Sequence, residues 1–248
     1  MRNILMTALA STMLLATAAH AQGALTPAQQ SEVKTIIKQY LTEENPDVVR
    51  KAVQALQQRE QAQQMQSTQD AVDKNKSKIY DNPDTPVLGN PKGDVAIIEF
   101  FDYQCGYCKM AHNAVKEALA KDNNLRFVAK ELPILGDGSV IASRAALASV
   151  KQGKYEKMHD ALMSNRGAMD EAAIMTLAKK AGLDTDKLKK DMQDKSIDAI
   201  INDNRALAQE LEIRGTPLFI IGDDIRPGAM NLEDMQRAVE NARKKTKQ

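Results

Sequence analysis

The chain has 248 residues, of which 43% are hydrophobic and 27% are charged, and its formal net charge at pH 7 is +1. This composition is typical of a soluble protein with one medium-sized domain and an appendage. Positive and negative side chains nearly cancel, and no long block of like charge occurs. The sequence therefore lacks the basic pattern of a nucleic-acid-binding protein, and we expect no nucleic-acid partner.

The N-terminus has the pattern of a secretory signal peptide. Arg2 precedes a mostly apolar run from Ile4 to Ala18, and the small residues Ala19 and Ala21 then flank a histidine. This arrangement predicts a signal peptide over residues 1–21, with cleavage after Ala21. The alternative is a membrane anchor, but the run is shorter than the ~20 apolar residues that span a bilayer. A secreted chain folds in an oxidising compartment, where paired cysteines can persist as disulfides.

Residues 22–80 have the pattern of two helices. Thr26 and Gln29 form a capping box, and Asn45–Pro46 repeats the helix start signal. The apolar positions are Val33, Ile36, Ile37, Tyr40 and Leu41 in the first helix and Val49, Val53, Leu56, Met65, Val72 and Ile79 in the second. They need a partner, which is the other helix, the main domain or the same region of another subunit. We expect a helical oligomerisation region, with a semi-rigid polar stalk as the alternative.

Turn residues from Asn82 to Gly93 mark the boundary before the main domain, which we place at residues 86–248. The run Val95–Phe101 follows and is apolar except for one acid, Glu99. A continuous apolar run of this length predicts a strand that is buried on both faces. A Glu99 buried in this strand has no obvious cationic partner in the sequence, so we expect its pKa to be raised. The alternative is a strand acid that reaches solvent.

Further elements follow in an order that defines the fold class. Strands are predicted at Leu125–Leu132 and Leu218–Ile221, and helical periodicity fills the region of about 139–211 between them. Lys109–Ala120 and Leu232–Lys244 also have helical periodicity. Strands at both ends of a helical block predict an α/β domain with a helical insertion.

The two cysteines of the sequence, Cys105 and Cys108, lie between the first strand and a helix. This spacing places Cys105 at the helix N-terminus, where free N–H groups and the helix dipole stabilise a thiolate. Cys108 is one turn further along, close enough for a disulfide. A disulfide that closes so small a loop constrains the unfolded chain little, which disfavours a purely structural staple.

A metal site is the other alternative for this pair, because His112 lies one helical turn after Cys108. Closed structural zinc sites have four ligands, however, and the remaining histidines, His20 and His159, lie in the signal peptide and in a distant helix. The pattern therefore favours redox chemistry over metal binding, and we expect neither a metal nor a cofactor.

A second distinctive stretch, Arg214–Ile221, places Pro217 at the start of a strand, where its missing N–H is tolerated.

The segments Glu99–Cys108 and Gly215–Pro217, with the helical insertion between them, resemble the DsbA-type thiol:disulfide oxidoreductases of the thioredoxin superfamily. The N-terminal helices are similar to those of the oligomeric periplasmic DsbA-like group that includes ScsC. The resemblance implies a thioredoxin fold with a helical insertion, preceded by an N-terminal helical oligomerisation region. It also implies that Pro217 is cis and lies opposite Cys105, and that Glu99 is the buried acid under the active site.

The resemblance implies a periplasmic enzyme that forms or isomerises disulfide bonds in exported proteins through Cys105 and Cys108. Glu99 would transfer a proton to or from Cys108, while Thr216 and Pro217 would bind the extended substrate backbone. Tyr107 would tune the thiolate or contact substrate. The prototype oxidase has Pro-His where this chain has Gly106–Tyr107, and Thr216 is similar to the residue before the cis proline of disulfide isomerases.

The expected partners are cysteine-containing exported proteins, a membrane redox partner that recycles the pair, and a second copy of this chain, with a homodimer favoured over a trimer. The balance of oxidase, isomerase and reductase activity stays open at this point. Two other classes of function also stay open. One is a metal-handling protein that uses the same cysteines with His112, and the other is a redox-inert oligomeric scaffold or chaperone.

Overall fold

The computed structural model describes residues 25–246, so the signal peptide expected over residues 1–21 lies outside the described residues. The chain divides into two compact units between Arg59 and Glu60. The long helix α2, Pro46–Lys74, contributes residues to both units. No helix within the described range is both long and apolar enough to cross a membrane.

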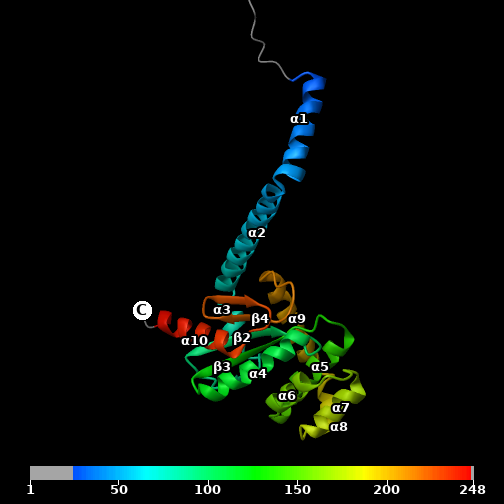
Figure 1. The fold of residues 1–248 in the computed structure, drawn as a ribbon. Helices are drawn as coiled ribbons and strands as arrows, with labels where there is room; N and C mark the ends of the chain where they lie inside the picture. Colours follow the sequence, from blue (N-terminus) through cyan, green and yellow to red (C-terminus); the bar gives the residue numbers. More distant parts are fainter. Residues whose placement is uncertain (1–24, 247–248) are drawn as a thin grey trace, which may run out of the picture. The chain divides into compact units, whose positions relative to one another are not determined.

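The first unit is helical throughout its described part (Figure 1). Helix α1, Pro27–Gln39, starts with the expected capping box, in which the Thr26 hydroxyl accepts from the Gln29 N–H and the Gln29 side chain accepts from the Thr26 N–H. A π-helical turn, η1 (Tyr40–Glu44), leads to α2, which begins at the expected proline. No residue of α1 is buried.

The second half of α2 belongs to the second unit, where Thr68 and Val72 are buried. The sequence predicted one helix as far as Ile79, but α2 ends at Lys74 and a short helix α3, Lys76–Tyr80, follows. The side-chain amide of Asn75 donates to the carbonyl of Ala71, a local bond of the kind that competes with helix continuation. Val72 and Ile79 pack against the sheet, so the main domain is the partner of these two positions.

A five-stranded sheet forms the centre of the second unit, with the order β1-β3-β2-β4-β5. The central strands β2 (Val95–Phe101) and β3 (Leu125–Glu131) are parallel, and β4 (Leu218–Ile221) pairs antiparallel with β2. These three strands are the ones that the sequence predicted. Two short edge strands, β1 (Val87–Gly89) and β5 (Asp224–Pro227), were not expected.

Alternation along β2 assigns its side chains to two cores. Ile97 and Phe101 face the cluster that contains residues of α4 (Gly106–Lys121), α10 (Leu232–Thr246) and the helical insertion. Ile98 and Phe100 face the other cluster, which contains Val72, Ile79 and the end of α9 (Lys195–Glu210). Both faces of β2 are therefore covered, as its continuous apolar run predicted. Figure 1 shows α4 and α10 beside each other over one face of the sheet.

The helical insertion lies between β3 and β4. It consists of α5 (Asp137–Ser149), the 3₁₀ turn η2 (Val150–Gln152), α6 (Tyr155–Ser164), α7 (Glu171–Lys180), α8 (Thr185–Asp191) and α9. Its helices span residues 137–210, close to the expected 139–211. Asp184 caps α8 by accepting from two backbone N–H groups.

Candidate active site: a dithiol at a helix N-terminus

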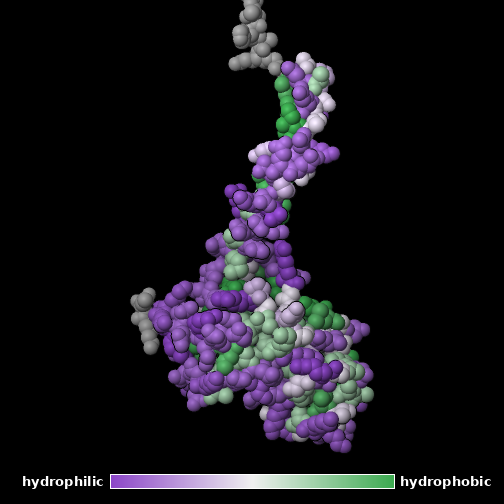
Figure 2. Space-filling model, in the orientation of Figure 1, coloured by the Kyte–Doolittle hydropathy of each residue, from purple (hydrophilic) through white to green (hydrophobic). Residues whose placement is uncertain are grey.

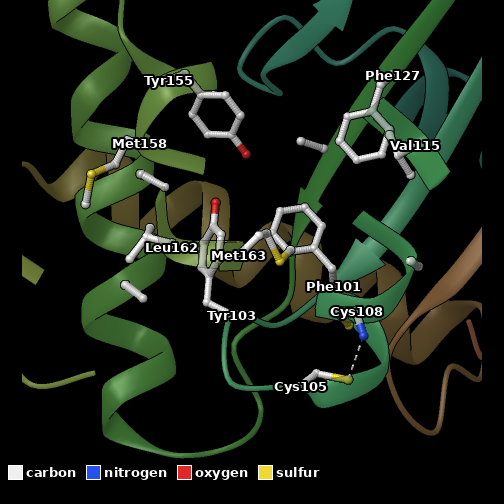
Figure 3. Packing of buried hydrophobic residues seen from close by; sticks show 14 of the residues in the cluster. Phe101, Tyr103, Cys105, Cys108, Val115, Phe127, Tyr155, Met158, Leu162 and Met163 are labelled. Carbon is white, nitrogen blue, oxygen red and sulfur yellow. Dashed lines mark hydrogen bonds between the residues drawn. The ribbon is translucent and has the colours of Figure 1, made fainter. Parts of the chain in front are cut away.

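The two cysteines occupy the start of α4, directly after the central strand β2. Cys105 is the N-cap residue, and its Sγ accepts a hydrogen bond from the backbone N–H of Cys108 at 3.3 Å (Figure 3). Both side chains are free thiols. Cys105 is 6% exposed and Cys108 is 0% exposed, so both residues are buried and Cys105 is the less buried of the two. The expected placement of Cys105 at a helix N-terminus is confirmed.

The start of β4 lies beside Cys105. The Thr216–Pro217 peptide bond is cis, as the resemblance implied, and the Cys105 thiol contacts the carbonyl oxygen of Thr216 at 3.2 Å. The pairing of Phe100 in β2 with Leu218 in β4 brings this segment next to the residues that follow β2. The structure therefore joins two motifs that are more than a hundred residues apart in the sequence.

Glu99 is buried in the middle of β2, with an exposed fraction of 1%. Alternation places it on the same side of the sheet as Ile97 and Phe101, the side that α4 covers. Its Oε1 has no hydrogen-bond partner among the described residues. Burial, and then the charge of Cys105, raise the pKa of this carboxyl well above its usual value. The alternative that Glu99 reaches solvent is wrong.

Cys108 is electrostatically coupled to this acid. Burial is the main cause that raises the pKa of the Cys108 thiol, and the negative charge of Glu99 raises it further. The two cysteines thus have different surroundings, because Cys105 accepts a helix N–H while Cys108 lies in the apolar interior beside a carboxyl group.

Tyr107, the second residue between the cysteines, is 64% exposed and is free to contact another molecule. Lys109, directly after Cys108, is buried at the same helix end, and its ammonium group donates to the carbonyl of Asn165. Burial and the charge of Arg166 lower the pKa of Lys109, while the charges of Asp102 and Cys105 oppose this shift. Sequence reasoning missed Lys109, although a cation next to the second cysteine was visible in the motif.

Asp102 is a second residue that sequence reasoning missed. Its buried carboxylate accepts from the backbone N–H of Gln104 at 2.7 Å, the hydroxyl of Ser139 at 2.7 Å and the backbone N–H of Ile134 at 2.8 Å. These bonds hold the residues before Cys105 against the start of the insertion. An acid directly after a strand signals such a cap, but its partners Ile134 and Ser139 lie more than thirty residues away.

His112 does not form a ligand set with the cysteines. Its Nε2 lies 3.0 Å from a carboxylate oxygen of Asp160, and its ring packs edge-on against His159. Within residues 25–246, no group of three or more His, Cys, Asp or Glu side chains is arranged to hold a metal ion. The alternative of a metal site at Cys105, Cys108 and His112 therefore lacks a donor set in this part of the chain.

The geometry suits thiol–disulfide chemistry. The less buried sulfur, that of Cys105, accepts a helix N–H, and the thiolate is the form of a cysteine that attacks disulfides. The second sulfur is one turn away on the same helix, so the pair can close to a disulfide. Burial raises the pKa values of both the Glu99 carboxyl and the Cys108 thiol, and the two groups are electrostatically coupled.

The family model and the similar solved structures agree on one family. The model of the DsbA-like thioredoxin domain matches residues 96–240. A thioredoxin-like oxidoreductase from Silicibacter pomeroyi is similar at 45% identity, with a TM-score of 0.67 over 68% of this chain and 98% of that chain. ScsC from Proteus mirabilis, in a transitional conformation, is similar at 27% identity, with a TM-score of 0.66 over 90% of this chain and 98% of that chain.

A periplasmic thioredoxin-like protein from Salmonella enterica is 26% identical, with a TM-score of 0.61 over 67% of this chain and 94% of that chain. A curated relative, the Na(+)/H(+) antiporter NhaA 1 of Salinispora arenicola, is 30% identical over 158 residues, which are 63% of this chain and 24% of the antiporter. This chain thus spans about a quarter of that relative. The thioredoxin fold with a helical insertion is confirmed, and the chain belongs to the family of DsbA-like thioredoxin domains.

Proposed function

We propose that this protein is a thiol:disulfide oxidoreductase that exchanges the Cys105–Cys108 pair with cysteines of exported proteins. The observation that carries the proposal is the asymmetry of the pair. Cys105 is the less buried of the two and accepts the Cys108 N–H at 3.3 Å, whereas Cys108 is fully buried and is coupled to the charge of Glu99. One sulfur is therefore suited to meet a substrate and the other to close the disulfide.

The proposed oxidation has two steps. A substrate thiolate attacks Cys105 Sγ of the oxidised pair, the bond between the two sulfurs breaks, and Cys108 leaves with the electron pair. A second substrate thiolate then attacks the substrate sulfur of the mixed disulfide, and Cys105 leaves. The substrate gains a disulfide, and its two electrons reside in the Cys105–Cys108 dithiol. A membrane redox partner removes these two electrons and so restores the disulfide. In isomerisation the reaction starts instead from the reduced pair, and Cys105 attacks a wrong substrate disulfide.

Glu99 has a role in proton transfer in this proposal. When Cys108 leaves, its raised pKa makes the thiol the favoured product, so a proton must reach a site that is closed to water. Burial raises the pKa of the Glu99 carboxyl well above its usual value, which favours the protonated form of this acid. Its charge couples to both cysteines, which supports its assignment as the donor and acceptor of this proton.

The substrate site lies on the exposed side of Cys105. Thr216 and Pro217 adjoin this sulfur, and an extended client segment would pair with the backbone there. Tyr107 offers an exposed ring next to the attacking cysteine. We assign these three residues to client binding.

The location follows from the signal peptide proposed for residues 1–21, and a similar structure is that of a periplasmic protein. We propose the periplasm, where the substrates are exported proteins with reduced or wrongly paired cysteines. An oxidising compartment supplies such clients and allows the oxidised pair to persist.

We further propose that the first unit assembles copies of this chain into a homo-oligomer, with a dimer favoured. Its large apolar residues are exposed in the single chain, and they include Val33, Ile36, Ile37, Tyr40, Val48, Val49, Val53 and Leu56. Figure 2 shows apolar side chains gathered along α1. A stripe of this kind on a helix is typical of helix–helix association. The alternative of a polar stalk does not explain why these positions are apolar.

A pair of assays tests the proposed activity. The mature protein should oxidise a reduced client in an oxidised glutathione buffer and should rearrange a scrambled client in a reduced one, and the same buffers give the reduction potential. Cys105→Ser should reduce both rates to the uncatalysed background. A redox-inert scaffold or chaperone would instead keep its full effect on client refolding after Cys105→Ser, and that result would contradict the proposal.

A further inference from the structure

A buried carboxyl group joins four elements of the second unit. The Oε1 atom of Glu131, the last residue of β3, accepts from the hydroxyl of Tyr103 at 2.9 Å and from that of Tyr155 at 2.8 Å. Its Oε2 accepts from the hydroxyl of Ser143 at 2.8 Å. The donors belong to the segment before Cys105, to α6 and to α5, and all are buried. Figure 3 shows the hydroxyls of Tyr103 and Tyr155 pointing toward the same space.

The Tyr103 hydroxyl has a second partner in the insertion. It lies 2.9 Å from Nδ1 of His159, on α6. Because a hydroxyl has one proton, a Tyr103 that donates to Glu131 accepts from the Nδ1–H of His159. Burial lowers the pKa of His159 well below its usual value, so this ring is neutral and has one N–H to give. Both partners of Tyr103 therefore come from outside its own segment.

This cluster has no direct part in the exchange chemistry. No described hydrogen bond joins Glu131, Tyr155 or His159 to either sulfur. Burial raises the pKa of Glu131 to about 8, while its hydroxyl donors oppose the shift. A buried polar cluster whose members are satisfied fixes one arrangement of the elements that it joins, since any shift leaves a buried group without a partner.

Tyr103 links this cluster to the attacking sulfur. It lies two residues before Cys105, and the Cys105 N–H donates to the carbonyl of Asp102 at 3.1 Å. The Asp102 carboxylate is itself bound to Ser139 at the start of the insertion. Two successive residues before the redox pair are therefore tied to the insertion, Asp102 at α5 and Tyr103 at α6.

We propose that Tyr103 is a positioning residue for Cys105, a role that rests on the proposed exchange activity. Its hydroxyl is bound by Glu131 and His159, and these bonds fix the segment before Cys105 relative to the helical insertion. Loss of this hydroxyl removes the bonds of this segment to α6 and β3, while Asp102 and Gln104 keep their bonds to Ser139. The bond from the Cys108 N–H to Cys105 Sγ, 3.3 Å long, is then held less firmly. Both the rate of exchange at Cys105 and the equilibrium between dithiol and disulfide should change.

The chain supplies a matched control for this proposal. Tyr103→Phe and Tyr155→Phe each remove a single hydroxyl from the same Glu131 oxygen, and both rings are buried. Only Tyr103 belongs to the segment before Cys105. The experiment measures, for the full mature chain and for both variants, the rate of exchange with a peptide disulfide and the equilibrium constant with glutathione. Urea unfolding reports the stability of each variant.

We expect Tyr103→Phe to change the exchange rate and the glutathione equilibrium constant by roughly fivefold, the factor that one buried hydrogen bond commonly represents. Tyr155→Phe should lose stability to a similar extent and keep both exchange constants. A second pair of variants repeats the test without altering Tyr103. Glu131→Ala removes the acceptor and should behave as Tyr103→Phe does, whereas Glu131→Gln keeps an acceptor oxygen and should restore the wild-type constants.

Two results would overturn the proposal. Equal exchange constants in wild type, Tyr103→Phe and Glu131→Ala would show that the cluster has a structural role only. Equal changes in Tyr103→Phe and Tyr155→Phe would show that the effect does not pass through the redox segment. Failure of the proposed activity is distinguishable from both, because the wild-type chain itself would then show no exchange.

Discussion

The two units of this chain differ in what covers their apolar side chains. In the second unit, both faces of the sheet are covered from within the chain, and Ile97, Ile98, Phe100 and Phe101 are fully buried. In the first unit, the large apolar residues remain exposed, and Ile36 has an exposed fraction of 59%. Apolar side chains are thus buried in the second unit and exposed in the first.

The difference indicates that the second unit covers its apolar side chains within one chain, whereas the first unit needs another surface to cover them. The dithiol site draws its residues from β2, α4 and the start of β4, all in the second unit. The first unit would gain stability in the proposed assembly by covering its apolar stripe, since burial contributes about 25 cal/mol per Å² of apolar area. We therefore expect exchange chemistry to need one chain and client rearrangement to need the assembly.

Deleting residues 25–59 should have the largest effect, because it removes the exposed stripe and leaves the second unit whole. The truncated protein should be a monomer that still oxidises small dithiol peptides, since Cys105, Cys108 and Pro217 are retained. It should lose isomerisation of scrambled clients, because two linked active sites no longer act on one client. Light scattering beside both assays measures this. A monomeric full-length protein, or intact isomerisation after truncation, would remove the oligomer explanation.

A longer deletion tests whether the end of α2 and α3 belong to the second unit. Removal of residues 25–79 also takes away Val72 and Ile79, which are buried against the sheet. Fully burying such a side chain contributes about 1.5–3 kcal/mol, so this deletion should lower the free energy of unfolding by about 3–6 kcal/mol relative to the deletion of 25–59. Urea unfolding of both proteins makes the comparison. Equal stability would show that the end of α2 and α3 are dispensable to the second unit.

Local sequence signals predicted the parts of the fold that depend on neighbours in the chain. The apolar run of β2 identified a central strand, and the spacing of Cys105 and Cys108 placed the first at a helix end. The cis bond at Pro217 came from family resemblance, because a proline at a strand start has no local signal for it.

The surroundings of Lys130 and Glu131 could not be predicted in this way. Both are buried, and Lys130 donates to the carbonyl of Lys78 on one side of the sheet, whereas Glu131 accepts from Tyr103 and Tyr155 on the other. Charged residues at the end of a strand are usually exposed. Their partners lie between 12 and 52 residues away, so only the folded chain shows what compensates their burial.

Glu99→Gln should change how stability depends on pH. The unfolded carboxyl has a pKa near 4.5, and burial raises the pKa in the folded chain well above it. Between these values unfolding releases a proton, so the free energy of unfolding falls as pH rises, by about 1.4 kcal/mol per pH unit. Glutamine does not titrate, and the variant should lose this part of the slope. Glu131 titrates in both proteins, so the difference isolates Glu99.

Urea unfolding of the two reduced proteins at several pH values from about 5 to about 7 gives the slope of the free energy of unfolding against pH for each. Parallel slopes in wild type and Glu99→Gln would contradict a raised pKa for Glu99. They would also remove the support for its role in proton transfer.

Tyr107→Ala should have the smallest effect. Because the ring is exposed, the free energy of unfolding should change by less than about 0.5 kcal/mol. The rate of client oxidation should fall while the oxidation of a small dithiol changes less, since we propose that the ring contacts the larger substrate. A loss of stability well beyond this range would show that the ring supports the fold of the second unit.

Trapping the mixed disulfide tests the central claim, that Cys105 at the helix N-terminus meets the substrate and the more deeply buried Cys108 closes the pair. A Cys108→Ser protein, incubated with a peptide disulfide and quenched with acid, should accumulate a covalent adduct that mass spectrometry of proteolytic fragments places at Cys105. A matched Cys105→Ser protein should accumulate almost none, because the remaining thiol is buried and the pKa of Cys108 is raised. Equal adducts in the two variants, or an adduct at Cys108 alone, would contradict the account.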